Sequence, residues 1–143
     1  MTPKIIQGGN HSDSRGEVAF VNDFDFVDIK RFYTITNANT SEFRAWQGHK
    51  LDNKNFYCVS GSFDIYFVKI DSWENPSKHL QIEKITLSAN DSKVLFIPAG
   101  YANGIKSLEP NSKLLSLSTL PLSQTAFDDV RFASDYWQIE END

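Results

Sequence analysis

Hydrophobic and polar residues alternate along several short segments of this chain, and glycine, proline or asparagine separates the segments. The residues at 80–87 alternate cleanly, and within 31–36 Tyr33 and Ile35 share one face of a strand while their neighbours share the other. Further strands are predicted at 18–21, 43–46, 55–60, 62–70, 94–97 and 113–118. Many short strands with turns between them are typical of an all-β sandwich or barrel.

Two local signals complete this prediction. Gly61 separates two strand-like runs, and the Gly-Ser pair at this place predicts that the runs form a β-hairpin. The tail from Thr125 to Trp137 is predicted to hold one helical turn. Because no repeat, low-complexity segment or linker interrupts the pattern, we expect a single domain over residues 1–143.

Two segments are arranged like the facing walls of a pocket in a double-stranded β-helix, the cupin jelly roll, and this is the fold that we predict. The first segment runs from Arg44 to Lys50 and the second, Pro-Ala-Gly-Tyr-Ala-Asn-Gly, covers 98–104. In metal-binding barrels of this kind, a His ends the second motif and a Glu stands seven residues before the turn glycine. Here those positions hold Asn103 and Lys54. An ammonium cannot coordinate a cation and an amide is a poor transition-metal ligand, so we expect a pocket with no metal or other cofactor.

Charge and cysteine usage narrow the choice of partners and compartment. The formal net charge of −5 argues against a nucleic acid or an anionic membrane as partner. No signal-peptide core and no apolar run of the roughly 20 residues needed for a membrane span occurs. Cys58 is the single cysteine, so an intrachain disulfide is excluded, and its apolar neighbours predict a buried, inert thiol. We expect a soluble, cytoplasmic protein.

His49 is the candidate general base among the three histidines. His11 and His79 lie in polar surroundings and are expected at the surface, whereas His49 follows a strand and stands among Arg44 and Gln47. The alternative is a structural histidine whose hydrogen bonds are satisfied within the fold. An imidazole in a partly desolvated barrel mouth has a pKa suited to accepting a proton near pH 7.

Three cationic residues at separate positions suggest an anion site in an acidic chain. Arg44 and Lys54 are expected to point from neighbouring strands towards one cavity, although surface ion pairing is the simpler alternative. Arg15 either belongs to a turn in which it pairs with Asp13 or holds a phosphate through its planar guanidinium group.

The order of these motifs resembles one known family. The matching segments are Asp-x-Arg-Gly at 13–16, Arg44 to Lys50, Lys54 before Gly61, and 98–104. Together they resemble the dTDP-4-dehydrorhamnose 3,5-epimerase-like cupins, which include the dTDP-4-keto-6-deoxyhexose 3,4-ketoisomerases. The resemblance extends from about Ile5 to Trp137.

Several positions depart from the patterns of this family. Against the ketoisomerase motif Arg-Gly-x-His-Ala-His-Lys, Gln47 replaces the first His, whereas His49 and Lys50 match. The epimerases carry a proton-donating Tyr on the last strand, and Ser116 stands at or near this position. The resemblance gives Tyr33 a role in positioning the sugar, with a core aromatic as the alternative. One acidic residue near the C-terminus would orient His49, and the candidates are Asp128, Asp129 and Asp135.

The resemblance implies a homodimeric isomerase that acts on a nucleotide-linked 4-keto-6-deoxy sugar in deoxysugar and cell-surface polysaccharide biosynthesis. His49 would move a proton between C3 and C4, with Tyr33 assisting. Substrate binding would fall to Arg15, Arg44, Gln47, Lys54 and Asn103. The alternatives are a 3,5-epimerase of the same substrate class and a catalytically silent sugar-nucleotide-binding cupin.

Overall fold

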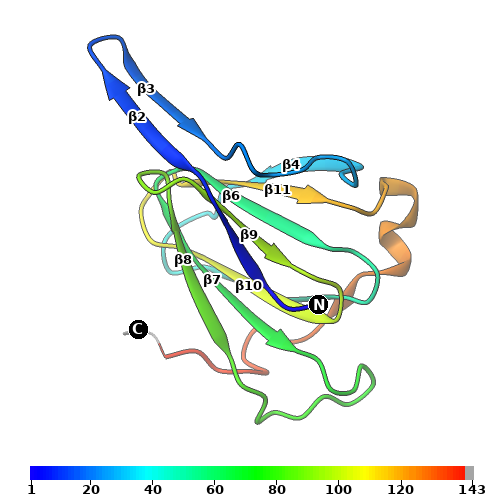
Figure 1. The fold of residues 1–143 in the computed structure, drawn as a ribbon. Coiled ribbons are helices and arrows are strands. Elements are labelled where there is room, and N and C mark those ends of the chain that lie inside the picture. The colour runs from blue at the N-terminus through cyan, green and yellow to red at the C-terminus, as the bar shows by residue number, and fades with distance from the viewer. Residues whose placement is uncertain (141–143) are drawn as a thin grey trace.

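The computed structural model describes residues 1–140 and consists almost entirely of antiparallel strands (Figure 1). The predicted domain extends to Asp143, and its last three residues lie outside the described part. The strands are β1 (Lys4–Gln7), β2 (Gly9–Asp13), β3 (Gly16–Phe20), β4 (Arg31–Ile35), β5 (Phe43–His49), β6 (Lys54–Ser60), β7 (Ser62–Lys69), β8 (Glu83–Ser88), β9 (Lys93–Ile97), β10 (Tyr101–Ser107), β11 (Lys113–Ser118) and β12 (Val130–Arg131).

Ten of these strands form two five-stranded sheets, with the order β1-β9-β6-β11-β4 in one and β12-β5-β10-β7-β8 in the other. Side chains from both sheets meet in one buried cluster that includes Phe56 and Leu95 from the first sheet and Phe63 and Ile105 from the second. Alternate residues of a strand point to opposite faces, so each sheet contributes one apolar face to this core. The predicted all-β fold, a double-stranded β-helix, is confirmed.

Gly61 does not close a β-hairpin, and that prediction was wrong. The strands on either side of it separate into different sheets, because β6 pairs with β9 and β11 while β7 pairs with β8 and β10. Gly61 has a φ of +70°, and a Cβ at this position would lie 2.0 Å from the Ser112 hydroxyl. The turn therefore needs glycine, but it carries the chain from one sheet to the other.

Strand β10 and the helical turn also differ from the sequence prediction. Strand β10 was missed because Asn103 and Gly104 have low strand propensity, and its pairing with β5 and β7 outweighs that preference. The single helical turn is a 3₁₀ helix, η1 (Leu122–Phe127), which begins three residues before the predicted segment.

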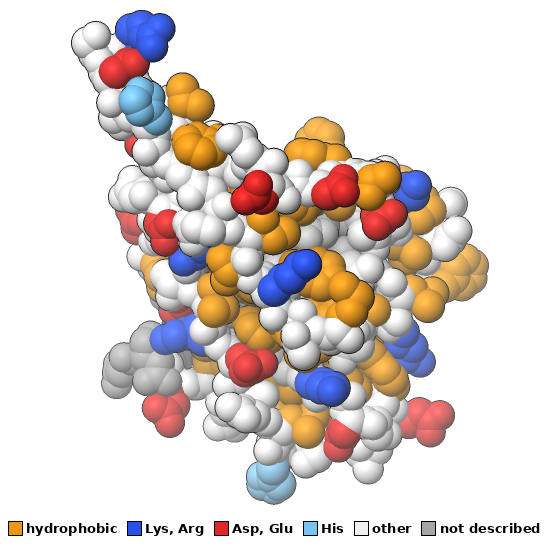
Figure 2. All heavy atoms as spheres, viewed as in Figure 1, with side chains coloured by type: hydrophobic (Ala, Val, Ile, Leu, Met, Phe, Trp, Pro, Cys, Tyr) orange, Lys and Arg blue, Asp and Glu red, His pale blue; other side chains and the backbone are white. Residues whose placement is uncertain are grey.

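Strands β2 and β3 form a separate hairpin that projects beyond the two sheets (Figure 1). Figure 2 shows charged side chains at its far end and hydrophobic side chains nearer the barrel. Exposed hydrophobic residues continue from this hairpin to β4, and they are Val18, Phe20, Phe26, Val27 and Phe32. No helix within residues 1–140 is long and apolar enough to cross a membrane.

Cys58 is buried on β6, as its sequence context predicts. Desolvation raises the pKa of its thiol to about 11. Because the thiolate is the reactive form, this cysteine is inert near neutral pH.

Candidate functional site

A cleft of about 710 Å³ opens between the two sheets, and a smaller recess of about 190 Å³ adjoins it. The cleft is lined from β4, β5, β6, β10 and β12, and the recess is closed by residues of η1 and the segment that follows it. Four side chains line both spaces, namely Arg31, Tyr33, Gln47 and Lys54. The cleft and the recess are therefore parts of a single site.

Most of the residues singled out in the sequence meet here. The cleft is lined by Tyr33, Arg44, Gln47, Lys54 and Asn103, and the recess holds His49. Arg15 is apart from them. It lies at the tip of the β2–β3 hairpin, its side chain is 88% exposed, and its Nη2 makes an ion pair of 2.8 Å with Asp13. Within this chain, Arg15 is therefore a turn residue paired with Asp13, which is one of the two alternatives given by the sequence.

An irregularity in β5 brings Arg44 to the same side as the other site residues. The register of the β5–β10 pair shifts between Asn103 and Gly104, where β5 carries one extra residue. As a result Arg44, Gln47 and His49 pair with alternate residues of β10, which are Ile105, Asn103 and Tyr101. Residues two apart on a strand face the same way, so these three side chains share one face despite the odd spacing from 44 to 47.

His49 is held with one ring nitrogen bonded and the other free. Its side chain is buried, and Nδ1 lies 2.8 Å from the backbone carbonyl oxygen of Asp128. A carbonyl only accepts, so Nδ1 carries the proton in the neutral ring and Nε2 carries the lone pair. Nε2 is buried and has no hydrogen-bond partner among the described residues. The ring is thus presented as a proton acceptor.

The surroundings of His49 favour its neutral form. Desolvation and the nearby Lys54 ammonium lower its pKa, whereas the bond to the Asp128 carbonyl and the carboxylates of Asp52 and Asp128 act in the opposite direction. The net pKa lies below the usual value for histidine. A histidine with a lowered pKa is available as a base throughout the neutral range.

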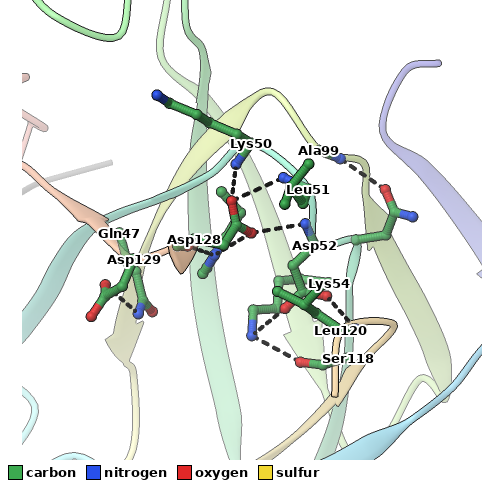
Figure 3. Close-up of polar contacts among 12 residues, drawn as sticks. Gln47, Lys50, Leu51, Asp52, Lys54, Ala99, Ser118, Leu120, Asp128 and Asp129 are labelled. Atoms are coloured by element: carbon green, nitrogen blue, oxygen red, sulfur yellow. Dashed lines mark hydrogen bonds and ion pairs between the residues drawn. The ribbon is translucent and has the colours of Figure 1, made fainter. Parts of the chain in front are cut away.

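Asp128 is the acidic residue that holds His49, which settles the choice that the sequence left open between Asp128, Asp129 and Asp135. Besides its carbonyl bond, its carboxylate accepts the backbone N–H groups of Lys50, Leu51 and Asp52 at 2.6–2.9 Å (Figure 3). These three donors follow His49 directly, where β5 ends. Asp128 therefore fixes both the imidazole and the chain that carries it.

Lys54 is buried at the start of β6 and uses its entire donor capacity inside the protein. Its Nζ lies 2.9 Å from the Tyr33 hydroxyl, 2.8 Å from Ser118 Oγ and 3.1 Å from Asp52 Oδ2. Asp52 is itself buried, and its other oxygen accepts bonds from Thr119 and the Leu120 backbone. An ammonium has three N–H donors, so this set saturates Lys54.

Tyr33 lies between two cations. Its hydroxyl accepts the bond from Lys54, and the Arg31 guanidinium carbon lies 4.7 Å from the centroid of its ring. Burial acts to raise the pKa of Tyr33, but the charge and hydrogen bond of Lys54, the neighbouring Ser116 hydroxyl and the charge of Arg31 together outweigh it, so the pKa is lower than usual.

Arg31 is a site residue that the sequence interpretation missed. It lines both spaces, and its Nε is buried with no hydrogen-bond partner within residues 1–140. Arg31 stands two residues before Tyr33 on β4, so the alternation that placed Tyr33 and Ile35 on one common face was sufficient to add Arg31 to that face.

Gln47 and Asn103 supply neutral polar groups. They are register partners on β5 and β10, and Gln47 Nε2 donates to Asp129 at 3.0 Å. Within residues 1–140, no group of three or more His, Cys, Asp and Glu side chains is placed to hold a metal ion. The absence of a metal from the working protein stays a prediction.

The fold is similar to that of several solved structures, whereas no curated protein matches the sequence. A sugar 3,4-ketoisomerase, QdtA from Thermoanaerobacterium thermosaccharolyticum, solved with TDP, has 22% identity and a TM-score of 0.70, over 94% of this chain and 91% of that one. The TDP-quinovose 3,4-ketoisomerase WlaRB from Campylobacter jejuni has 25% identity and a TM-score of 0.67, over 94% and 95%.

Epimerases of the same fold are also similar. The RmlC epimerase of Mycobacterium tuberculosis has 20% identity and a TM-score of 0.67, over 82% of this chain and 63% of that one. At family level the match is nearly complete, because the model described as FdtA, WxcM-like, C-terminal, aligns with residues 1–141. The chain belongs to this WxcM-like C-terminal family.

Proposed function

We propose that this protein is an isomerase that moves the carbonyl group between C4 and C3 of a dTDP-linked 4-keto-6-deoxy sugar during deoxysugar biosynthesis. The observation that carries the proposal is the free, buried Nε2 of His49, whose side chain lines the recess that adjoins the cleft. A mutant of the similar QdtA enzyme, solved in complex with TDP-4-keto-6-deoxyglucose, indicates the class of substrate.

In this reaction His49 is the base that acts on carbon. Its Nε2 removes the proton from C3, which is acidic because it lies next to the C4 carbonyl, and the resulting imidazolium returns a proton to C4. Asp128 keeps the correct tautomer throughout, because Nδ1–H stays bonded to its carbonyl oxygen. A single base on one face of the sugar is sufficient for the transfer between the carbons, and the reaction is balanced when the proton of the C3 hydroxyl passes to the C4 oxygen.

The remaining site residues bind and orient the substrate. Arg44 lines the cleft with an exposed side chain, and its Nε makes only a long contact of 3.5 Å to Asn37, so the guanidinium is available to the diphosphate. Gln47 and Asn103 offer amide groups to the sugar hydroxyls. The substrate-binding role of Lys54 is indirect in this proposal, since its three donors are already engaged.

A 3,5-epimerase is the second candidate, because epimerases share the fold. Inversion needs an acid on the face of the sugar opposite the base. Ser116, which stands near the epimerase Tyr position, is fully buried on β11 and its hydroxyl is too weak an acid for this task. The third candidate is a silent binder of sugar nucleotides.

Proton NMR of dTDP-4-keto-6-deoxyglucose with the protein in heavy water separates the three candidates. A ketoisomerase incorporates deuterium through one base and produces the 3-keto isomer. Exchange at both C3 and C5 would support the epimerase, and binding without exchange would support the silent binder.

We also propose a cytoplasmic homodimer. The exposed hydrophobic surface from β3 to β4, which includes Val18, Phe26, Val27 and Phe32, supports a second copy as its cover. The projecting hairpin would then carry Arg15 towards the partner's cleft, which is the arrangement in which Arg15 could bind a phosphate. Sedimentation velocity of the wild type and of Val27→Asp tests this, since a monomeric wild type would overturn it.

A further inference from the structure

The side-chain amide of Gln47, which lines both the cleft and the recess, is held in one orientation. Its Nε2 donates to Asp129 Oδ1 at 3.0 Å (Figure 3). A carboxylate only accepts hydrogen bonds, so the amide nitrogen must face Asp129 and the carbonyl oxygen, Oε1, must point away from it. Within residues 1–140, Oε1 makes no hydrogen bond of its own. The amide therefore offers the site an acceptor and not a donor.

Asp129 is itself held by Arg131, the register partner of Gln47 on β12. Arg131 Nε lies 3.0 and 3.2 Å from the two carboxylate oxygens of Asp129. Burial acts to raise the pKa of Asp129, but the hydrogen bonds from Gln47 and Arg131 and the charges of Arg131 and His49 together lower it. The carboxylate is therefore ionised near neutral pH and cannot donate to Gln47.

An acceptor is a scarce group at the junction of the cleft and the recess. Four described side chains line both spaces, and Gln47 is the one among them whose acceptor atom is not already bonded within residues 1–140. Arg31 and Lys54 carry only donors. The Tyr33 oxygen accepts from Lys54 at 2.9 Å. A substrate hydroxyl in this part of the site therefore has its open acceptor at Gln47.

The substrate class of the proposed function, on which this inference rests, leaves one suitable hydroxyl for that acceptor. A 4-keto-6-deoxyhexose joined to dTDP through C1 carries hydroxyls only at C2 and C3. The C3 hydroxyl becomes a carbonyl in the product, and a carbonyl has no proton to donate to Gln47 Oε1. The C2 hydroxyl is unchanged by the reaction, and C2 is bonded to C3, the carbon on which His49 acts.

We propose that Gln47 accepts a hydrogen bond from the C2 hydroxyl of the sugar, and that Asp129 is a positioning residue that acts through Gln47 by holding its amide in the accepting orientation. Gln47 and His49 lie two residues apart on β5, so they share one face and their Cα atoms are about 6.6 Å apart. Two neighbouring carbons of a sugar ring fit between side chains at this spacing. The site thus selects sugars that have a hydroxyl at C2.

The contact has a defined kinetic signature. Because C2 takes no part in the reaction, the hydrogen bond has the same strength in the bound substrate and in the transition state. Such a bond lowers KM and leaves kcat unchanged. Its loss should raise KM by about 2- to 10-fold, the range for one neutral hydrogen bond.

The test compares wild type, Gln47→Met and Asp129→Asn, each as the full-length protein, on two substrates. One is dTDP-4-keto-6-deoxyglucose, and the other is its analogue with fluorine in place of the C2 hydroxyl, which is similar in size and cannot donate. Methionine keeps the length of glutamine and has no amide oxygen. Gln81→Met, at an exposed glutamine outside the cleft, is the matched control. NMR follows the 3-keto products, and circular dichroism confirms that each variant is folded.

In the wild type we expect a higher kcat/KM for the hydroxyl substrate than for the fluoro analogue. The ratio of the two values should fall about 2- to 10-fold in Gln47→Met, through KM, and stay at the wild-type value in Gln81→Met. Comparing ratios cancels the inductive effect of fluorine, which is present in every variant. Asp129→Asn should also lower the ratio, because Asn can turn its oxygen or its nitrogen to Gln47 and no longer fixes the amide.

Binding of dTDP alone, which lacks the hexose, should be unchanged in Gln47→Met by calorimetry. If the fluoro analogue is not turned over, its inhibition constant replaces kcat/KM in the same comparison. Equal ratios in wild type and Gln47→Met, or weaker binding of dTDP alone, would overturn the role of Gln47 and leave the proposed function intact. A wild-type ratio in Asp129→Asn would overturn the positioning role of Asp129. A wild type that binds substrate but forms no 3-keto product would overturn the proposed function as well.

Discussion

The backbone carbonyl of Asp128 and Nδ1 of His49 lie 2.8 Å apart, although 79 positions separate the two residues in the sequence. This contact decides which ring nitrogen holds the proton and leaves Nε2 without a hydrogen-bond partner among the described residues. The same aspartate binds three backbone N–H groups immediately after His49. The base and the end of its strand are therefore positioned by one residue from the C-terminal segment.

The first prediction concerns His49 itself. Replacement by Asn keeps much of the side-chain shape and removes the base, so turnover of dTDP-4-keto-6-deoxyglucose should fall by about 100-fold or more. Affinity for dTDP should be unchanged. Proton NMR in heavy water and calorimetry measure the two quantities, with His79→Asn, an exposed histidine, as control. Full activity of His49→Asn would remove His49 from the mechanism.

The second prediction is a pH dependence of stability. Because the pKa of His49 is lower in the folded protein than the ordinary value of 6.5, the unfolded chain binds more protons between these two values. The free energy of unfolding should therefore rise with pH through this window. The contribution of His49 to stability is fully present above pH 6.5 and is lost as the pH falls through the lowered pKa. Urea unfolding at several pH values measures it, and subtraction of the His49→Asn series cancels other groups. An identical pH dependence in both proteins would contradict the lowered pKa.

The third prediction concerns anion binding. Arg44→Ala should weaken dTDP binding by on the order of 1.5–3 kcal/mol, the range for a charge-assisted hydrogen bond. The fold should be little affected, since the side chain is exposed. Calorimetry measures the affinity, and Lys93→Ala, which removes a cation paired with Asp91 away from the cleft, is the control. Equal affinity in both variants would locate the diphosphate elsewhere.

The fourth prediction concerns the carboxylate of Asp128. Asp128→Ala leaves three backbone N–H groups without their acceptor and should destabilise the protein by at least about 2 kcal/mol. Asp128→Asn retains an oxygen acceptor and should lose less. Urea unfolding ranks the two variants, with exposed Asp28→Ala as control. Equal stability of Asp128→Ala and wild type would show that these bonds contribute nothing.

The fifth prediction is that the purified protein holds no stoichiometric transition metal. An ammonium at Lys54 and an amide at Asn103 occupy the positions where related barrels place a carboxylate and an imidazole. Elemental analysis after dialysis measures the content. One iron, zinc or manganese per chain would require a different set of ligands from those expected here.

The sequence by itself determined the class of fold and one wall of the site. Strand periodicity is a local property, so the strand of Tyr33 and a strand over 43–46 were predicted from neighbouring residues alone, although the second strand continues to His49. Arg44, Gln47 and His49 belong to one strand, but only the register shift between β5 and β10 places Arg44 on the same face as the other two. The order of the motifs was sufficient to indicate the family.

Tertiary structure decided everything that depends on which strands become neighbours. Periodicity does not specify pairing partners, and so it did not reveal that the strands flanking Gly61 enter different sheets. The bond between Asp128 and His49, the saturation of Lys54 and the entry of Arg31 into the site all join segments distant in sequence. Arg15 is the opposite case. Its motif matched the family by spacing, but the residue lies on a projecting hairpin, outside the cleft of its own chain. Such contacts are fixed by the packing of the two sheets and not by local sequence.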